Sequence, residues 1–229
     1  MWWWNLPRPT VPGEQGAGRS GARLHRAVDL EAACRALGLE VSEDQKSRLL
    51  RYRDLLAEWS RKVDLVAPAG PEEVLRAHIL DSLLLLVMAD PAPAAWVVDV
   101  GSGAGLPGVV WAVARPDLWV VMLEPRRKRA AFVERVVLEL GLRNAQAEPL
   151  RAEQAAKQAR YARQFQMAVC RALGTPEQVA RLARGLVRPA GRVVVPVGPQ
   201  RPVRPPFQEL QRPVPWERGK VRRVAVLLV

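Results

Sequence analysis

The first third of the chain carries apolar residues at the spacing of amphipathic helices. Gly38 stands where a first helix would stop, because glycine readily adopts the left-handed conformation that ends helices. Ser42 and Gln45 have the spacing of a capping box, which marks the start of a second helix. Pro71 suits the first turn of a third helix, which contains the sequence HILDS at residues 78–82. The expected helices cover residues 29–37, 42–63 and 71–88.

After the stiff sequence PAPA at residues 91–94, short apolar runs alternate with helical segments. Strands that alternate with helices predict an α/β fold with a mostly parallel, doubly wound sheet. Ligands of such sheets bind beyond the carboxyl ends of the strands. The expected strands cover residues 96–100, 119–123, 166–170, 192–197 and 222–229. The expected helices cover residues 109–114, 127–140 and 175–186, and residues 199–215 are expected to form a proline-rich connection.

The composition divides the chain into three expected parts. Residues 1–27 are rich in Gly, Pro and Arg and have no regular period, which predicts a disordered tail. Residues 28–94 are expected to form a helical region, and residues 95–229 an α/β domain. With 229 residues, the chain can bury one sizeable core beside a small accessory region.

The sequence VDVGSGAGLPG at residues 98–108 predicts a ligand-binding loop between a strand and a helix. Its GAGLPG part matches the dinucleotide pattern G-x-G-x-x-G, and Glu124 follows at the distance of a ribose-binding acid. Both features also occur in sites for S-adenosylmethionine (SAM). A carboxylate at Asp99 would repel a pyrophosphate, and Pro107 lacks the N–H that a phosphate would need. SAM has no phosphate and carries cationic groups that an acid stabilises, so this loop predicts a SAM site.

The segment CRALGTP at residues 170–176 bears on the methyl acceptor. Methylation of an exocyclic base amine usually goes with an Asn/Asp-Pro-Pro-aromatic stretch, which this segment lacks. Methylation of a pyrimidine carbon needs a cysteine nucleophile. Cys170 is a candidate, but it closes an apolar strand and is also interpreted as a packed core thiol. An acceptor with its own lone pair, such as purine N7, needs neither a base nor a nucleophile.

The net charge of +12 and the isoelectric point near 11.0 favour an anionic partner, nucleic acid first. An arginine-rich composition that arises from coding bias is the alternative. Arg126, Arg127, Lys128 and Arg129 stand at the start of an expected helix, where the helix dipole disfavours cations. We interpret this cluster as an RNA contact, with a solvated helix start as the alternative.

Several features indicate the cellular setting. The start of the chain lacks the order of a secretory signal, and the longest apolar run, Leu83–Ala89, is far too short to span a membrane. Cys34 and Cys170 lie far apart and do not have the spacing of zinc ligands. We therefore expect a cytoplasmic protein that acts as a monomer, without a disulfide, a metal site or a membrane partner.

These motifs together resemble the RsmG (GidB) family, the SAM-dependent methyltransferases of guanine N7 in 16S ribosomal RNA. The resemblance covers about residue 29 to the C-terminus. It rests on HILDS, DVGSGAGLPG, LEPRRKRAAFV, the L-R-A-E run that ends at Glu153, and C-R-A at residues 170–172. It implies a class I SAM-dependent methyltransferase fold, which is Rossmann-like, preceded by a helical region. It also implies 16S ribosomal RNA or the small ribosomal subunit as the partner.

The resemblance implies SAM contacts at several positions of this chain, and the loop adds others. We expect Asp99, Gly101, Gly103 and Gly105 around the methionine part of SAM, and Glu124 on the ribose. The remaining expected cofactor contacts are Leu106, Ala152, Glu153 and Arg171, of which Ala152 and Glu153 would border the adenine. Lys128 and Arg129 would be the Lys-Arg pair of the family and would hold RNA together with Arg126 and Arg127.

Four positions depart from the family pattern. Glu124 replaces the usual aspartate after the second strand, and Ala77 replaces the arginine before HILDS. Gln166 replaces an aspartate in the fourth strand, and Val197 replaces the lysine of a Lys-Gly pair after the fifth. The losses bear on the acceptor side of the site rather than on SAM binding. An RNA-binding or ribosome-assembly protein with lost or altered catalysis is therefore a rival hypothesis, and a methyltransferase of small molecules or proteins is a second.

The expected reaction is a single in-line displacement without a general base. Guanine N7 carries a lone pair and no proton, so a base would have nothing to remove. Catalysis would then depend on alignment and local electrostatics. Arg171 is the expected positioning residue, and the alternative is an arginine that packs beside SAM without contact to RNA.

Overall fold

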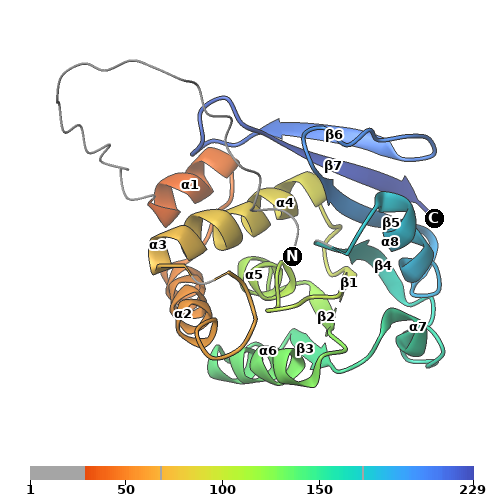
Figure 1. Ribbon diagram of the computed structural model, residues 1–229, viewed down its shortest axis with the longest axis horizontal. Coiled ribbons are helices and arrows are strands. Elements are labelled where there is room, and N and C mark those ends of the chain that lie inside the picture. The colour runs from red at the N-terminus through yellow and green to blue at the C-terminus, as the bar shows by residue number, and fades with distance from the viewer. Residues whose placement is uncertain (1–28, 68, 172) are drawn as a thin grey trace, which may run out of the picture.

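The structure of this protein is a computed structural model, which describes residues 29–67, 69–171 and 173–229. A sheet of seven strands separates two layers of helices (Figure 1). The helices α1 to α6 lie on one side of it, and α7 and α8 lie on the other. The expected tail at residues 1–27 lies outside the described residues.

The elements follow the chain in the order of a helical part and then an α/β part. The helices are α1 (Leu30–Leu37), α2 (Glu43–Trp59), α3 (Pro71–Val74), the π-helix η1 (Leu75–Leu80), α4 (Asp81–Ala89), α5 (Gly108–Ala114), α6 (Arg127–Glu139), α7 (Ala152–Ala155) and α8 (Pro176–Ala183). The strands are β1 (Trp96–Val100), β2 (Trp119–Leu123), β3 (Ala145–Glu148), β4 (Phe165–Val169), β5 (Val187–Val197), β6 (Gln208–Pro213) and β7 (Val221–Leu228).

Local signals set the first helix boundaries as predicted. Gly38 ends α1 in the left-handed conformation with φ of 72°, and Ser42 and Gln45 form the capping box of α2. The third expected helix is present as α3, η1 and α4 in direct succession. The π-helical turn in its middle could not be read from an apolar period of 3.6 residues, because its hydrogen bonds skip one residue more.

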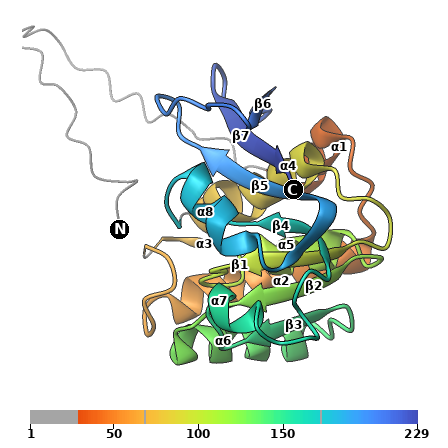
Figure 2. The same cartoon turned by 90° about the vertical axis from the view of Figure 1, so that its right-hand side faces the viewer.

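The sheet has the strand order β3-β2-β1-β4-β5-β7-β6. The strands β1 to β5 pair in parallel, whereas β7 is antiparallel to both of its neighbours. Figure 2 shows β6 and β7 at one end of the sheet and β3 at the other. The order reverses between β1 and β4, and the carboxyl ends of these strands are where such a sheet binds its ligand. The predicted α/β class is confirmed.

Three elements were not predicted. The expectation of an irregular connection over residues 199–215 was wrong for Gln208–Pro213, which forms the edge strand β6. Edge strands carry polar residues and proline because one side of their backbone stays unpaired, so they lack the apolar signal of a central strand. Two further elements were not predicted, because they also lack an apolar run. They are the short strand β3, with the sequence AQAE, and the single helical turn α7.

The buried core continues from the helical part into the sheet. One cluster joins Leu56 of α2 and Leu83 of α4 to Trp111 of α5 and Met122 of β2. The Trp111 indole also donates a hydrogen bond to the carbonyl oxygen of Ser82, at 2.9 Å. A second cluster fills the other face of the sheet, under α7 and α8. The division at residues 94 and 95 into two parts stays a prediction.

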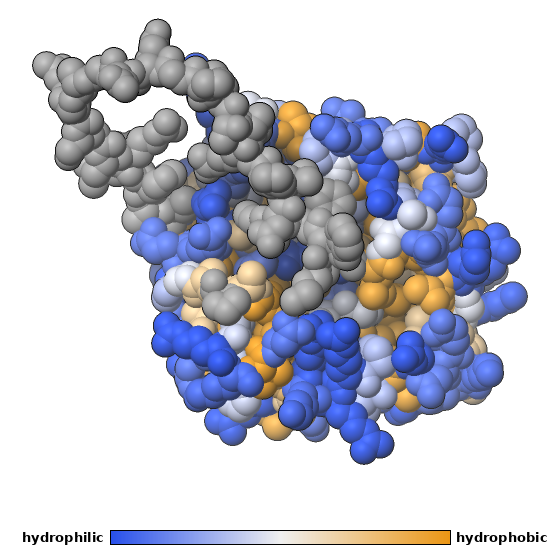
Figure 3. Space-filling view, in the orientation of Figure 1, coloured by the Kyte–Doolittle hydropathy of each residue, from blue (hydrophilic) through white to orange (hydrophobic). Residues whose placement is uncertain are grey.

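The outer surface is mostly hydrophilic on the face shown in Figure 3, with smaller apolar areas between the polar ones. Within the described ranges, no helix has the length and apolar character needed to cross a membrane.

Candidate SAM and RNA site

The glycine loop connects β1 to α5 and depends on glycine for its shape. Gly101, Gly103 and Gly105 have φ angles of 69°, 59° and 90°, which side chains disfavour. The amides of Gly101 and Ser102 both donate to the carbonyl oxygen of Leu123, at 2.8 and 3.1 Å, which ties the loop to the end of β2. A Cβ atom at Gly101 would stand 2.4 Å from Cδ1 of Leu173. The loop therefore needs glycine at position 101 for both conformation and space.

Glu124 joins this loop to the start of α6. Its Oε2 accepts a hydrogen bond from the Gly103 amide and its Oε1 accepts one from the Arg126 amide, both at 2.9 Å. The residue is only 5% exposed. Each carboxylate oxygen can accept a second hydrogen bond, so the group can fix the loop and still receive hydroxyl donors. This carboxylate is therefore suited to a diol such as that of a ribose.

Asp99 lies behind the glycine loop rather than on its open side. Its side chain is fully buried, and Oδ2 accepts a hydrogen bond from the Gly108 amide at 2.9 Å. Oδ1 has no hydrogen-bond partner among the described residues, and neither has the buried hydroxyl of Ser102. Burial raises the pKa of Asp99 to about 7, against smaller opposing effects of the Gly108 hydrogen bond and of the Arg171 charge. In this conformation its effect on a ligand at the outer face of the loop would be electrostatic.

The HILDS motif holds Arg171 in place. Nη2 of Arg171 lies 3.0 Å from Nδ1 of His78, and Nη1 donates to Oδ2 of Asp81 at 3.4 Å. Arg222 of β7 forms an ion pair with the same aspartate. Burial, together with the nearby Arg171 charge, lowers the pKa of His78 to about 3. The imidazole is therefore neutral at pH 7, and its Nδ1 accepts from the guanidinium.

Tyr52 supports the loop from the helical part of the chain. It is fully buried in α2, and its hydroxyl donates to the carbonyl oxygen of Ala104 at 2.7 Å. The sequence offered no signal for this role, because Tyr52 stands on the apolar face of a helix like any core residue. HILDS was noticed as a motif, but the contacts of His78 and Asp81 with Arg171 depend on the tertiary fold.

The four cations at the start of α6 have different surroundings. Arg126, Arg127 and Lys128 are exposed, as RNA contacts must be. The Arg129 side chain is 20% exposed, and its Nη2 donates to Oδ2 of Asp64 at 2.7 Å. Its Nη1 also lies 4.0 Å from the place that a Cβ of Gly103 would take. Nη1 of the exposed Arg126 lies 3.7 Å from the same Asp64 oxygen, which is a looser ion pair. Arg129 therefore lies over the glycine loop, less exposed and more closely paired than the other three cations.

The remaining expected positions lie around the same edge of the sheet. Leu106 is 3% exposed inside the loop, and Ala152 is buried at the start of α7 in a cluster with Val100 and Leu123. Glu153 follows on the surface. The structure thus brings Ala152 to the ends of β1 and β2, next to the elements that carry the glycine loop and Glu124.

Cys170 has the surroundings of a structural thiol. It is fully buried in the core, and burial raises its pKa above the ordinary value of a thiol. A nucleophilic cysteine needs a lowered pKa and access to its substrate. The packed-thiol interpretation is therefore the one that agrees with the structure.

The structure also locates two of the residues that depart from the family pattern, Gln166 and Val197. The Gln166 side chain accepts a hydrogen bond from the amide of Trp96, the first residue of β1, at 2.9 Å. Gln166 therefore lies at the amino end of the sheet, and its assignment to the acceptor side was wrong. Val197 at the end of β5 is 5% exposed, so it packs in the core.

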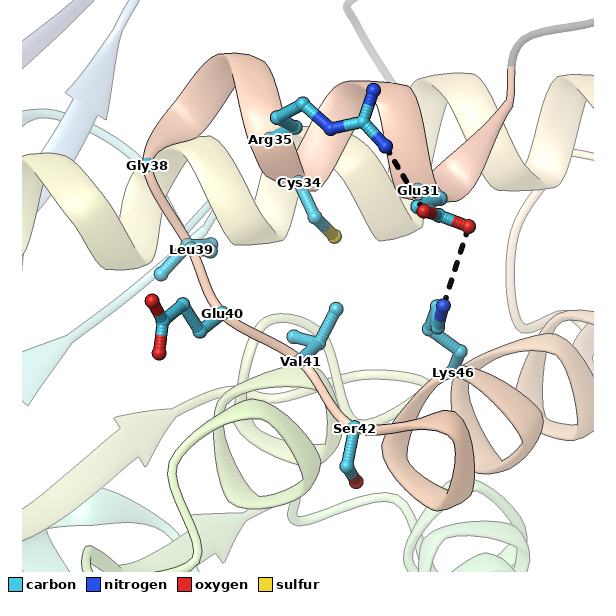
Figure 4. Close-up of a pocket in the computed structure, with 9 residues that line it drawn as sticks. All are labelled: Glu31, Cys34, Arg35, Gly38, Leu39, Glu40, Val41, Ser42 and Lys46. Atoms are coloured by element: carbon cyan, nitrogen blue, oxygen red, sulfur yellow. Dashed lines mark hydrogen bonds and ion pairs between the residues drawn. The ribbon is translucent and has the colours of Figure 1, made fainter.

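A cavity of about 630 Å³ lies away from the glycine loop, between α1 and the start of α2 (Figure 4). Cys34 points into it, and Lys46 on its rim pairs with Glu31 at 3.4 Å. Burial raises the pKa of the Cys34 thiol to about 11. None of the expected cofactor or RNA residues lines this cavity. Across the described ranges, no group of three or more His, Cys, Asp or Glu side chains is arranged to hold a metal ion.

The comparisons with known proteins agree with the resemblance of the motifs. The family described as rRNA small subunit methyltransferase G matches residues 45–201. The "Ribosomal RNA small subunit methyltransferase G" of Ralstonia nicotianae is 37% identical over 204 residues, which are 86% of this chain and 88% of that protein. The protein of the same name from Moorella thermoacetica is 35% identical over 170 residues, 74% of this chain and 71% of its own length.

A solved structure of MtNAS in complex with MTA and tNA shares the fold with a TM-score of 0.53, at 16% identity. The similarity covers 88% of this chain and 82% of that one. At this identity the similarity speaks for the fold alone. The match to the family and the identity to its curated relatives show that the chain belongs to the rRNA small subunit methyltransferase G (GidB) family.

Proposed function

We propose that this protein transfers a methyl group from SAM to N7 of a guanine in the 16S ribosomal RNA of the small subunit. The observation that carries the proposal is the glycine loop bound to Glu124 at the carboxyl ends of β1 and β2. It occurs in a chain whose relatives are named ribosomal RNA small subunit methyltransferases. The net charge of +12 favours a polyanionic substrate.

The residues of the loop fit SAM as the cofactor. Glu124 is buried with a free acceptor position on each oxygen, which suits the two ribose hydroxyls. The glycines in the left-handed conformation have no side chain, so a ligand can approach the backbone closely. The anionic form of Asp99 behind them would stabilise the cationic methionine part of SAM. The adenine would lie against Ala152 and Glu153, and Leu106 and Arg171 complete the expected cofactor contacts.

When bound, SAM supplies a methyl carbon on a sulfonium, which is electrophilic enough for direct transfer. The side chains around Arg171 are arranged for positioning and not for proton transfer. His78 is neutral and accepts a hydrogen bond from Arg171, and Asp81 is paired with two arginines. Guanine N7 has no proton to lose, so the reaction needs no base. These chain residues therefore support the base-free mechanism.

Arg171 would position the acceptor base. Its guanidinium is fixed by His78 and Asp81, so it can offer a remaining N–H to guanine O6 or to a phosphate. A fork on both O6 and N7 would block the attacking atom. A single donor to O6 or to a neighbouring phosphate leaves N7 free and aligned.

Arg126, Arg127 and Lys128 would hold the RNA backbone, because they are exposed beside the loop. Arg129 would contribute less to RNA affinity than Arg127 and Lys128, since it is less exposed and its charge is closely paired with Asp64. The partner is 16S ribosomal RNA or the small ribosomal subunit, and we infer that the enzyme acts on it as a cytoplasmic monomer without a metal.

The rival function is RNA binding or ribosome assembly without methyl transfer. The buried valine at position 197 and Ala77 in η1 favour it, because both replace cations on the acceptor side. Small ribosomal subunits from a strain that lacks the modification, incubated with this protein and labelled SAM, separate the two functions. Label at guanine N7 is the expected result. RNA without label in every assembly state would support the rival, and activity with a weak salt dependence would indicate a small-molecule or protein substrate.

A further inference from the structure

The loop between β5 and β6, residues 198–207, lies next to the acceptor side of the site. Nη1 of Arg201 donates to the carbonyl oxygen of Gly174 at 3.4 Å. Gly174 belongs to the same short connection after β4 as Arg171, and Leu173 of this connection covers Gly101. The loop after β5 is therefore tied to the segment that carries the positioning residue.

This loop is held in one conformation by Arg223 of β7. Nη1 of Arg223 donates to the carbonyl oxygens of Gly198, Pro199 and Arg201, at 2.8, 2.9 and 3.1 Å. Its Nε is paired with Glu209, which neutralises the charge of this structural arginine. The sequence GPQRPVRPP adds four prolines with fixed φ angles. A loop fixed in this way loses little conformational entropy when it binds a partner.

Arg201 and Arg204 are the charged residues that this stiff loop presents. Arg204 is exposed, and the polar partner of Arg201 is a backbone carbonyl. Within the described parts of the chain, neither guanidinium forms an ion pair with a carboxylate. Hydrogen bonds from Thr175 and from the backbone lower the pKa of Glu177, and the charges of both arginines lower it further. The two arginines therefore share one local surface with the N-terminal end of α8.

We propose that Arg201 and Arg204, the β5–β6 arginine pair, bind the RNA backbone on the acceptor side of the site. They would act across the glycine loop from Arg126, Arg127 and Lys128, so that the target strand is held on both sides of the cofactor loop. The proposal rests on the proposed function. Guanidinium groups suit phosphate because they offer planar, paired donors and stay charged. Because Arg201 and Arg204 lie in a rigid loop, their phosphate contacts would have a fixed position relative to Arg171.

The test is the double variant Arg201→Ala/Arg204→Ala. The RNA probe is protein-free 16S ribosomal RNA from a strain that lacks the modification, bound at a series of salt concentrations. We expect the affinity to fall at least tenfold. The slope of log K against log salt should decrease by about 0.7 for each lost single-strand phosphate contact, or about 1.4 for two. The SAM affinity, measured by calorimetry, should stay unchanged, which also shows that the variant is folded.

Two further variants control for charge and location. Arg201→Lys/Arg204→Lys keeps the charge and should keep most of the affinity. Arg184→Ala/Arg188→Ala removes the same charge from exposed arginines near the start of β5, at the opposite edge of the sheet. This variant should bind RNA with nearly the parental salt slope.

The outcomes separate the two proposals. Parental affinity and slope in Arg201→Ala/Arg204→Ala, or an equal loss in Arg184→Ala/Arg188→Ala, would overturn the role of the β5–β6 arginine pair. Failure of the parent protein to methylate any small-subunit substrate would contradict the proposed function. The RNA affinities measured at different salt concentrations test the role of the β5–β6 arginine pair independently of methyl transfer. A parent protein that binds neither the protein-free RNA nor the small ribosomal subunit would overturn both.

Discussion

Glu124→Gln tests the central contact of the site. The carboxylate accepts hydrogen bonds from two backbone amides, at Gly103 and Arg126. A glutamine has one acceptor oxygen, so one of these buried amides would face an N–H donor instead. A hydrogen bond to a charged group contributes about 1.5–3 kcal/mol, and we expect the free energy of unfolding to fall by about that amount. The ribose also loses an acceptor oxygen.

The affinity for SAM should therefore fall at least tenfold, or about 1.4 kcal/mol. Calorimetry with SAM and with its demethylated product measures the affinity, and urea denaturation measures the stability. Glu139→Gln is the matched control, because Glu139 also accepts from two partners, Arg51 and Arg135, but stands at the far end of α6. Its SAM affinity should equal that of the parent. Parental affinity and stability in Glu124→Gln would refute the assignment of the ribose site.

Five other substitutions test separate parts of the site. Because burial raises the pKa of Asp99 from 3.8 to about 7, stability should fall as pH rises between these values and then level off. Asp99→Asn should remove this slope in urea denaturation, and an unchanged slope would assign it to another group. Gly101→Ala should weaken SAM binding at least tenfold. Leu173→Ala, added to this variant, should restore the part of the affinity that is lost through the steric clash. Parental SAM affinity in Gly101→Ala would contradict the requirement for glycine at position 101. Arg171→Ala should lower the single-turnover rate tenfold or more, about 1.4 kcal/mol in the barrier. Lys128→Ala should mainly weaken RNA affinity and flatten its salt dependence. If Arg171→Ala and Lys128→Ala lowered the single-turnover rate equally, Arg171 would not have a positioning role that Lys128 lacks.

The sequence predicted the parts of the fold that depend on local signals. The capping box at Ser42, the stop at Gly38 and the apolar strands β1 and β2 appear where they were expected, because each is determined by a few neighbouring residues. The edge strand β6 and the short β3 were missed because their stability comes from pairing with a neighbouring strand rather than from an apolar pattern.

The site shows the same limit. Glycine spacing predicted a loop between a strand and a helix, and the structure has this loop between β1 and α5 with Glu124 bound to it. The strand, the loop and the next strand follow one another along the chain, so this part could be read from sequence. Its contacts with SAM stay a prediction. The contacts of His78 and Asp81 with Arg171 join positions that are distant in sequence, so only the fold reveals them. The cluster at the start of α6 illustrates a further difficulty. Four adjacent cations look equivalent in sequence, but Asp64 pairs closely with Arg129, whereas Arg127 and Lys128 stay exposed.

The hydrogen bond from Tyr52 to Ala104 has a consequence for how the protein unfolds. The helix α2 and the glycine loop share this bond and one continuous core, so local opening of the loop must also disturb the helix. A ligand that closes the loop would then slow amide exchange in α2, although it touches no residue there. Cofactor binding would then be measured as slower amide hydrogen exchange in α2, a helix that lies far from the glycine loop in sequence.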